Sequence, residues 1–101
     1  MTTLKVIIAP RAQSDLEAIG DYIAARNPAR AESFVEELIG RCLTLSEQPE
    51  RFPLAERLAQ TGVRKMVHGN YLIFYRVYPD RVTIARILHG ATDYEARFPA
   101  P

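Results

Sequence analysis

The sequence predicts an α+β fold in the order β-α-α-β-β-β, with a helical hairpin packed on a four-stranded, mainly antiparallel sheet. Three observations predict it: a short apolar run before the first proline, two segments with helical apolar periodicity, and three later runs rich in β-branched and aromatic residues. The chain has 101 residues, 48% of them hydrophobic, which suits one compact core. We therefore expect residues 1–101 to form a single domain.

The first strand and the first helix are predicted from residues 6–23. Residues 6–9 are a short apolar run closed by Pro10, which suits the first turn of a helix because its missing N–H would have no partner there. Apolar residues then recur at spacings of four, three and four: Ala12, Leu16, Ile19 and Ile23. This spacing predicts one amphipathic helix.

A second helix is predicted to begin after Asn27, a good N-cap, with Pro28 at the first helical position, and to end before Pro49. Its apolar stripe comprises Ala31, Phe34, Val35, Leu38, Cys42 and Leu45. We interpret Cys42, the single cysteine, as a small buried hydrophobic residue rather than a catalytic thiol. The short break between the two helices predicts an antiparallel hairpin.

Residues 47–62 are predicted to be a loop, followed by three strands over residues 63–68, 71–78 and 81–88. Gly69-Asn70 and Pro79-Asp80 suit the tight turns of an antiparallel meander. The middle run is apolar at both parities, which predicts a central strand covered on both faces. Because one hairpin covers one face, we expect the C-terminal segment or a partner to cover the other. Residues 91–101 are predicted to form a short C-terminal helix or tail.

Charge and composition exclude several classes of protein. The net charge is +1, but residues 1–50 carry five Lys and Arg against eight Asp and Glu, whereas residues 51–101 carry eight against four. The longest apolar stretch, residues 71–75, is too short to cross a bilayer, and the N-terminus lacks the pattern of a secretory signal. We expect a cytoplasmic protein without a membrane partner. One cysteine and two histidines predict no metal site and no cofactor.

Three stretches, residues 63–66, 71–77 and 84–90, together with the first-helix pattern, resemble the ParE/RelE toxin superfamily. The ending Arg86-Ile87-Leu88-His89 is the most distinctive part. The superfamily contains gyrase inhibitors of the ParE kind and ribosome-dependent messenger RNA ribonucleases of the RelE kind. Leu72 stands where some ribonuclease relatives place an arginine, and Gly90 where they can place a catalytic tyrosine. The chain therefore resembles the ParE kind more closely.

This resemblance implies the toxin of a type II toxin–antitoxin system, of the plasmid-stabilisation kind, neutralised by a ParD-like antitoxin. The implied target is DNA gyrase, inhibited by binding without chemistry, and no sequence-specific nucleic-acid binding is expected. The alternative is a ribosome-dependent mRNA endoribonuclease that uses Arg64, Arg86 and His89, with Arg76 as a further candidate. An inactive module that retains only antitoxin affinity is a third possibility.

Two groups of residues are the predicted binding sites. The expected antitoxin contacts are Arg64, Arg76, Arg86, Leu72 and Phe74. The arginines fall on three successive strands, where a cross-sheet cluster would bind antitoxin carboxylates, although each could instead reach water or pair with a nearby acid. The expected target contacts are His89, Asp93, Tyr94, Arg97 and Phe98. We expect His89 to cap a turn more readily than to catalyse, and Tyr75 to pack in the core.

Overall fold

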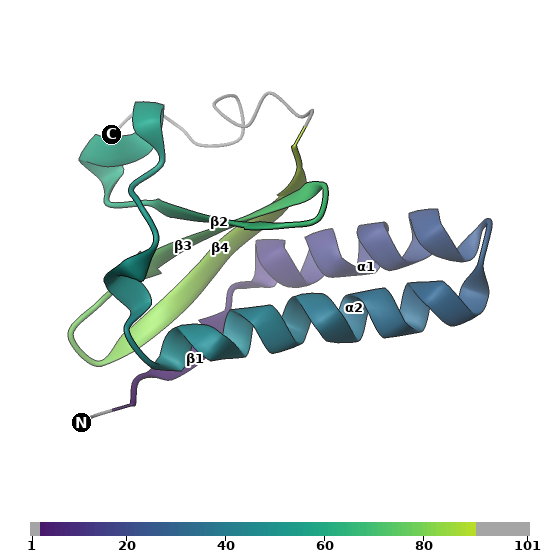
Figure 1. Ribbon diagram of the computed structural model, residues 1–101, viewed down its shortest axis with the longest axis horizontal. Coiled ribbons are helices and arrows are strands. Elements are labelled where there is room, and N and C mark those ends of the chain that lie inside the picture. Colours follow the sequence, from purple (N-terminus) through teal and green to yellow (C-terminus); the bar gives the residue numbers. More distant parts are fainter. Residues whose placement is uncertain (1–2, 91–101) are drawn as a thin grey trace.

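A computed structural model describes residues 3–90, without the side chains of residues 57 and 59, and confirms the predicted α+β fold (Figure 1). The elements are β1 (Lys5–Ile8), α1 (Pro10–Ala24), α2 (Pro28–Leu43), β2 (Arg64–His68), β3 (Tyr71–Val77) and β4 (Arg81–His89). The strand order is β1-β4-β3-β2, parallel between β1 and β4 and antiparallel elsewhere. The two helices form the predicted hairpin.

Both helices begin as their sequences indicate. Pro10 and Pro28 occupy first-turn positions, and the Asn27 side chain accepts a hydrogen bond of 3.1 Å from the Arg30 N–H. The helix residues that are buried are Ala12, Leu16 and Ile19 of α1 and Ala31, Leu38 and Cys42 of α2. These residues belong to the predicted apolar stripes, so burial of the stripes fixes which faces the helices turn inward.

The turn between β2 and β3 sets the register of the sheet. Gly69 has a φ of 58°, which suits the first central position of a two-residue hairpin turn, and His68 pairs with Tyr71. β3 is the central strand of the meander and is buried over residues 73–75, as predicted. A bulge between β3 and β4 leaves Ala85 as the extra residue, because Phe74 pairs with Arg86 while Tyr75 pairs with Ile84.

The two faces of the sheet carry separate cores. One core packs the helices against residues that include Met66, Ile73, Tyr75, Ile84 and Ile87. The second core lies on the other face and comprises Ala55, Leu58, Val63, Phe74 and Leu88, with Leu72 packed against it. Part of the face left open by the hairpin is therefore covered by the segment that precedes β2.

That segment corrects the predicted loop over residues 47–62. It contains two short 3-10 helices, Pro49–Arg51 and Glu56–Thr61, and a third, Thr44–Ser46, directly follows α2. Pro49 stands at the start of the first of these, and the Arg51 guanidinium donates 2.7 Å to the Glu47 carbonyl oxygen. Proline breaks an α-helix but is compatible with a single tight turn, which is why the pattern indicated irregular structure.

Candidate functional site

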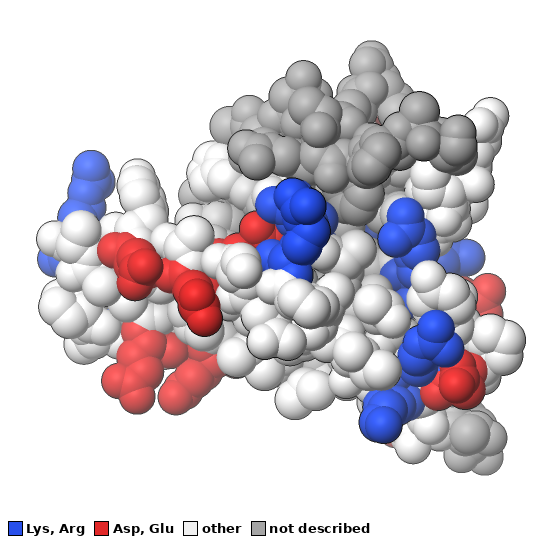
Figure 2. Space-filling view, turned by 180° about the vertical axis from the view of Figure 1, so that it is seen from behind, with Lys and Arg blue, Asp and Glu red and all other residues white. Residues whose placement is uncertain are grey.

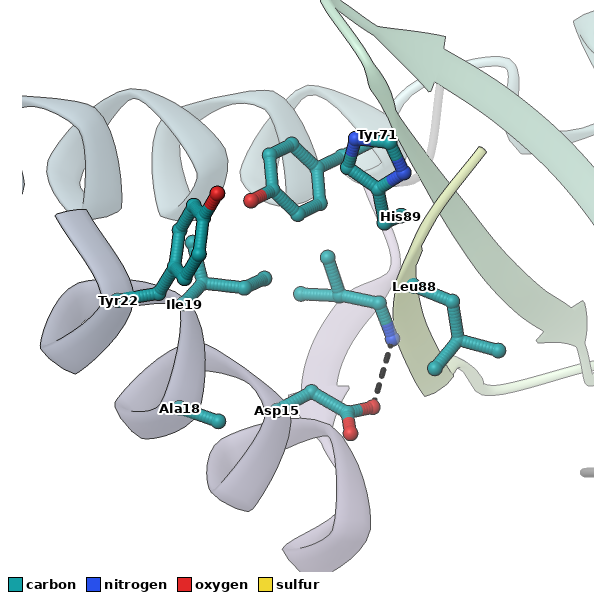
Figure 3. Close-up of a pocket in the computed structure, with 8 residues that line it drawn as sticks. Asp15, Ala18, Ile19, Tyr22, Tyr71, Leu88 and His89 are labelled. Carbon is teal, nitrogen blue, oxygen red and sulfur yellow. Dashed lines mark hydrogen bonds between the residues drawn. The ribbon is translucent and has the colours of Figure 1, made fainter. Parts of the chain in front are cut away.

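The candidate site forms where β4 continues beyond β1. β1 pairs with β4 only over residues 81–84, so the following residues of β4 have no strand beside them on that edge. α1 covers this edge, and the Asp15 carboxylate accepts a 2.9 Å hydrogen bond from the Ile87 N–H (Figure 3). A helix side chain thus takes the place of a neighbouring strand and satisfies a buried backbone donor.

The same carboxylate holds Arg86. The Arg86 Nε and Nη2 atoms lie 2.8 Å from the two Asp15 oxygens, and the two side chains are only 9% and 12% exposed. The hydrogen bond to Asp15 raises the pKa of Arg86 above its ordinary value. Its remaining nitrogen, Nη1, is buried and has no hydrogen-bond partner among the residues that the structure describes. This bidentate pair joins α1 to β4 and is a structural element.

The predicted cross-sheet arginine cluster is wrong in its geometry. Arg64 pairs with Tyr75 and lies on the face of the hairpin, where it donates 2.7 Å to the Phe52 carbonyl oxygen. Arg76 follows Tyr75 along β3, takes the opposite face and donates 3.2 Å to the Thr61 carbonyl oxygen. The bulge places Arg86 opposite Phe74, and its guanidinium group is bound by Asp15 of α1. The three guanidinium groups therefore serve three different parts of the fold.

The two apolar residues predicted to contact the antitoxin differ in exposure. Phe74 is fully buried in the second core, whereas Leu72 is half-buried beside it. Four of the predicted target contacts, Asp93, Tyr94, Arg97 and Phe98, lie outside the described residues.

A pocket of about 430 Å³ adjoins the edge of β4 that α1 covers (Figure 3). Its lining residues are Asp15, Ala18, Ile19, Tyr22, Tyr71, Ile87, Leu88 and His89. A second pocket, of about 440 Å³, shares Tyr22, Tyr71 and His89 with it and extends to Phe34 and the β2–β3 turn. We refer to the two pockets together as the aromatic groove.

Aromatic contacts organise this groove. The Tyr71 ring packs edge-on against His89 at 5.3 Å between centroids and tilts against Phe34 at 5.5 Å. Figure 3 shows the hydroxyl groups of Tyr22 and Tyr71 pointing toward each other. Burial, and secondarily Tyr22, raises the pKa of the Tyr71 hydroxyl. Tyr22 itself is 65% exposed, so the groove presents an open aromatic surface to a partner.

The residues of the ribonuclease alternative do not converge. Arg64 is four residues from His68 along β2, about 13 Å at the usual rise of a strand. His68 lies opposite Tyr71, which in turn lies opposite His89, so Arg64 and His89 stand near opposite ends of the meander. Arg86 is buried in its ion pair.

A close contact with the β2–β3 turn explains why a glycine suits position 90. Its N–H donates 2.7 Å to the Asn70 carbonyl oxygen, and a Cβ at this position would lie 3.2 Å from the same oxygen. A tyrosine here would crowd the β2–β3 turn.

Two expectations about core residues are confirmed. The Tyr75 ring is fully buried and its hydroxyl donates 2.6 Å to the Pro49 carbonyl oxygen. Cys42 is fully buried in α2. Among the described residues, no three His, Cys, Asp or Glu side chains form a group that could hold a metal ion. No helix in the described part of the chain has the length and apolar character needed to cross a membrane.

Burial raises the pKa of the Cys42 thiol to about 11. We expect Cys42 of the native protein to resist alkylation by iodoacetamide at pH 8 and to react rapidly once the chain is unfolded in urea, because only the exposed thiolate is nucleophilic. Since the unfolded thiol loses its proton first, this group should also make stability fall as pH rises from about 9 toward 11. Mass spectrometry of the alkylated protein gives the test, and rapid native labelling at pH 8 would contradict it.

Tyr22 and Asp15 belong to the first-helix pattern that resembles the superfamily (Ala12, Asp15, Leu16, Ile19, Tyr22 and Ile23), but neither was predicted as a site residue. Tyr22 adjoins the apolar stripe of α1, and its position beside Ile23 could have marked it as a residue at the border of the helix's buried face. The pairing of Asp15 with Arg86 could not be predicted from local sequence, because the two residues stand 71 positions apart.

Comparisons with known proteins agree with this architecture. Residues 6–94 match the family described as ParE toxin of type II toxin-antitoxin system, parDE. The chain is 34% identical over 90 residues to Toxin RelE3 of Caulobacter vibrioides, covering 84% of this chain and 92% of the relative. It is 38% identical over 88 residues to Toxin RelE2 of the same organism, covering 86% and 96%.

Two solved structures are similar in fold. A chain of the chromosomal ParDE toxin–antitoxin system of P. aeruginosa superimposes with a TM-score of 0.73 at 20% identity, covering 86% of this chain and 96% of that one. A chain of the RelBE2 toxin–antitoxin complex of Mycobacterium tuberculosis gives a TM-score of 0.61 at 28% identity, covering 91% and 97%. On the family match and the identity to its relatives, the chain belongs to the ParE/RelE superfamily of type II toxin–antitoxin toxins.

Proposed function

We propose that this toxin acts by binding DNA gyrase and is neutralised by a ParD-like antitoxin. The single observation that carries the proposal is the separation of Arg64, Arg86 and His89, which a ribonuclease of this chain would need together. General acid–base catalysis needs its groups within hydrogen-bond reach of one scissile bond. Two arginines engaged in structural bonds and one distant histidine favour a binding protein.

The antitoxin is proposed to occupy the aromatic groove. Both solved relatives come from toxin–antitoxin systems. The groove offers exposed Tyr22 and His89 over an apolar floor, the composition of a protein-binding surface. Leu72, Arg64 and Arg76 remain proposed antitoxin contacts, whereas Phe74 and Arg86 are too buried in this structure to be reached without a rearrangement.

The proposed gyrase contact is the chain end that starts at His89 and includes Asp93, Tyr94, Arg97 and Phe98. His89 is exposed at the end of β4 and lines the aromatic groove. An antitoxin in the groove would therefore lie against the start of the proposed gyrase-binding segment, which gives a physical reason for neutralisation.

A gyrase assay with the purified chain tests the target. We expect the toxin to inhibit supercoiling and to increase the amount of cleaved DNA trapped in the enzyme, and an equimolar antitoxin to restore activity. The matched control is the same chain tested on a topoisomerase of another type, which should retain full activity. Gyrase that works normally at saturating toxin would refute the proposal.

One observation favours the second candidate, ribosome-dependent mRNA cleavage: two relatives are named as RelE toxins. Primer extension on transcripts from induced cells distinguishes the two. Cuts within translated codons that disappear with His89→Ala would establish the ribonuclease. Intact transcripts during growth arrest support gyrase.

A further inference from the structure

The face of the sheet opposite the hairpin carries three basic residues at the end where β1 begins and β3 ends. These residues are Lys5 of β1, Arg76 of β3 and Arg81 of β4. Their neighbours along each strand belong to the core between sheet and hairpin or pack against it: Val6, Tyr75, Val77 and Val82. Because side chains alternate along a strand, the three basic residues stand on the other face. We refer to Lys5, Arg76 and Arg81 as the basic corner.

The strand register brings the three residues of the basic corner close together. Lys5 pairs with Arg81, so their Cα atoms lie on neighbouring strands about 4.8 Å apart. The Tyr78 N–H donates 2.8 Å to the Arg81 carbonyl oxygen, which places Tyr78 opposite Arg81 and Arg76 diagonally from it, at about 7–8 Å. From Lys5 to Arg76 the corner therefore spans about 12 Å at the usual strand spacings.

Positive charge dominates this corner. Lys5 is exposed and makes no side-chain hydrogen bond or ion pair within the part of the chain that the structure describes. Arg76 donates 3.2 Å to the Thr61 carbonyl oxygen, and no described carboxylate pairs with it. Arg81 binds Asp80 at 2.8 Å, and its side chain is 39% exposed. Figure 2 shows Lys and Arg side chains gathered at this end of the molecule, whereas Asp and Glu side chains predominate on the hairpin.

Tyr78, beside the corner, is not an open platform for stacking a nucleic-acid base. The Arg81 guanidinium lies over its ring, 4.2 Å from the centroid. Proteins that bind single strands commonly stack the bases on open aromatic rings. The corner instead offers charge and N–H donors, which suit a phosphate backbone whose bases are paired. Arg81 can bind both Asp80 and a phosphate, because a guanidinium has five N–H donors.

We propose that the basic corner binds the phosphate backbone of duplex DNA, without regard to sequence. The two strands of a duplex together carry one negative charge per roughly 1.7 Å of helix axis, so a corner of about 12 Å faces several phosphates at once. The acidic hairpin is repelled by DNA, which orients the chain with the basic corner toward it. The source of the duplex is the DNA held by gyrase, and this part of the inference rests on the proposed gyrase target.

Fluorescence anisotropy with the purified full chain and labelled duplexes of about 20 base pairs tests the binding. We expect a Kd of about 10⁻⁴–10⁻⁶ M at roughly 50 mM salt, equal for two unrelated sequences. Three phosphate contacts predict that log K falls with log salt with a slope of about −2.7. Absence of binding, or affinity that does not depend on salt, overturns the proposal. A tenfold preference for an RNA duplex or for single-stranded DNA of the same sequence overturns the assignment to duplex DNA.

A double substitution locates the binding. Lys5→Ala with Arg81→Ala removes two contacts and leaves Arg76, which is also a proposed antitoxin contact, in place. We expect the affinity to fall by tenfold or more and the salt slope to shrink to about −0.9. Arg26→Ala, at an exposed arginine between α1 and α2, is the matched control and should bind as the unchanged chain does. Unchanged binding in the double variant, or equal loss in the control, places the DNA elsewhere.

Asp80→Asn provides a gain of binding that damage to the fold cannot imitate. It removes the carboxylate bound to Arg81 and keeps a residue that suits the turn. The repulsion between this carboxylate and a nearby phosphate disappears, so duplex binding should strengthen by about threefold. Circular dichroism melting verifies that each variant is folded. Unchanged or weaker binding of folded Asp80→Asn contradicts the proposal.

Gyrase assays separate failure of this inference from failure of the gyrase target. We expect Lys5→Ala with Arg81→Ala to bind DNA-free gyrase with unchanged affinity in calorimetry, but to trap several-fold less cleaved DNA. If the unchanged chain binds duplex DNA but not gyrase, the gyrase target is wrong and the corner is still a DNA-binding site. If the double variant traps as much cleaved DNA as the unchanged chain, the target stands and the role of the corner is refuted.

Discussion

Replacing Asp15 with alanine is expected to lower the free energy of unfolding by about 3–5 kcal/mol. The substitution leaves the Arg86 guanidinium 9% exposed and without its counter-ion. It also removes the acceptor of the buried Ile87 N–H. The free energy of unfolding of a domain of this size is about 5–15 kcal/mol in total, so the substitution would remove a large part of it.

Urea unfolding followed by circular dichroism measures this change, and the melting temperature should fall by about 15 °C or more. Glu17→Ala is the matched control, because Glu17 stands on the same helix, is exposed and has no ion pair within the described chain. It should alter stability by less than about 0.5 kcal/mol. A loss below about 1 kcal/mol in Asp15→Ala would show that the pair contributes little to the fold.

A double variant separates the charge from the packing. Asp15→Leu with Arg86→Met replaces the ion pair by apolar side chains, which is often neutral, but it still leaves the Ile87 N–H without an acceptor, at about 1–3 kcal/mol. We therefore expect the double variant to be more stable than Asp15→Ala alone. The opposite order would mean that the Arg86 guanidinium stabilises the native state through a contact other than the one with Asp15.

The helices and strands were predictable because their signals are local. Pro10, Asn27 and Pro28 mark where the helices begin, and the apolar spacings fix which faces are buried. Gly69 and Asn70 fix the hairpin turn and with it the register of β2 against β3. Such signals need no knowledge of distant segments.

The error in the arginine cluster has two different causes. The hairpin register already sets Arg64 opposite Tyr75, so Arg76 falls on the other face, and parity alone could have excluded that pairing. Arg86 could not have been placed in this way. Its position depends on the bulge at Ala85 and on Asp15, 71 residues earlier, and neither leaves a periodic trace.

The aromatic groove likewise could not be predicted from local sequence patterns. It exists because β4 outlasts β1 and α1 covers the unpaired edge, which is a consequence of strand lengths in the assembled sheet. Tyr22 looked like one more residue of an amphipathic helix, yet it is 65% exposed and lines a groove together with the half-buried Tyr71. An exposed aromatic at the border of a helix stripe is the feature to look for in similar sequences.

Tyr22→Ala is expected to weaken the affinity for the cognate antitoxin by about 30-fold or more, which corresponds to about 2 kcal/mol. Tyr22 lines both pockets of the aromatic groove, and its ring is available for burial by a partner. Aromatic residues that become fully buried at the centre of an interface commonly dominate the binding energy. Isothermal titration calorimetry with the purified antitoxin measures the effect.

Leu43→Ala is the matched control, since Leu43 is also a large, exposed apolar residue, at the far end of α2 and outside the groove. Both substitutions remove exposed surface, so neither should lower the free energy of unfolding by more than about 0.5 kcal/mol. If Tyr22→Ala and Leu43→Ala bind the antitoxin equally well, the groove is not the antitoxin site. If only Tyr22→Ala loses affinity and induction still arrests growth in the presence of antitoxin, neutralisation and toxicity rest on separable contacts, as the two proposed surfaces require.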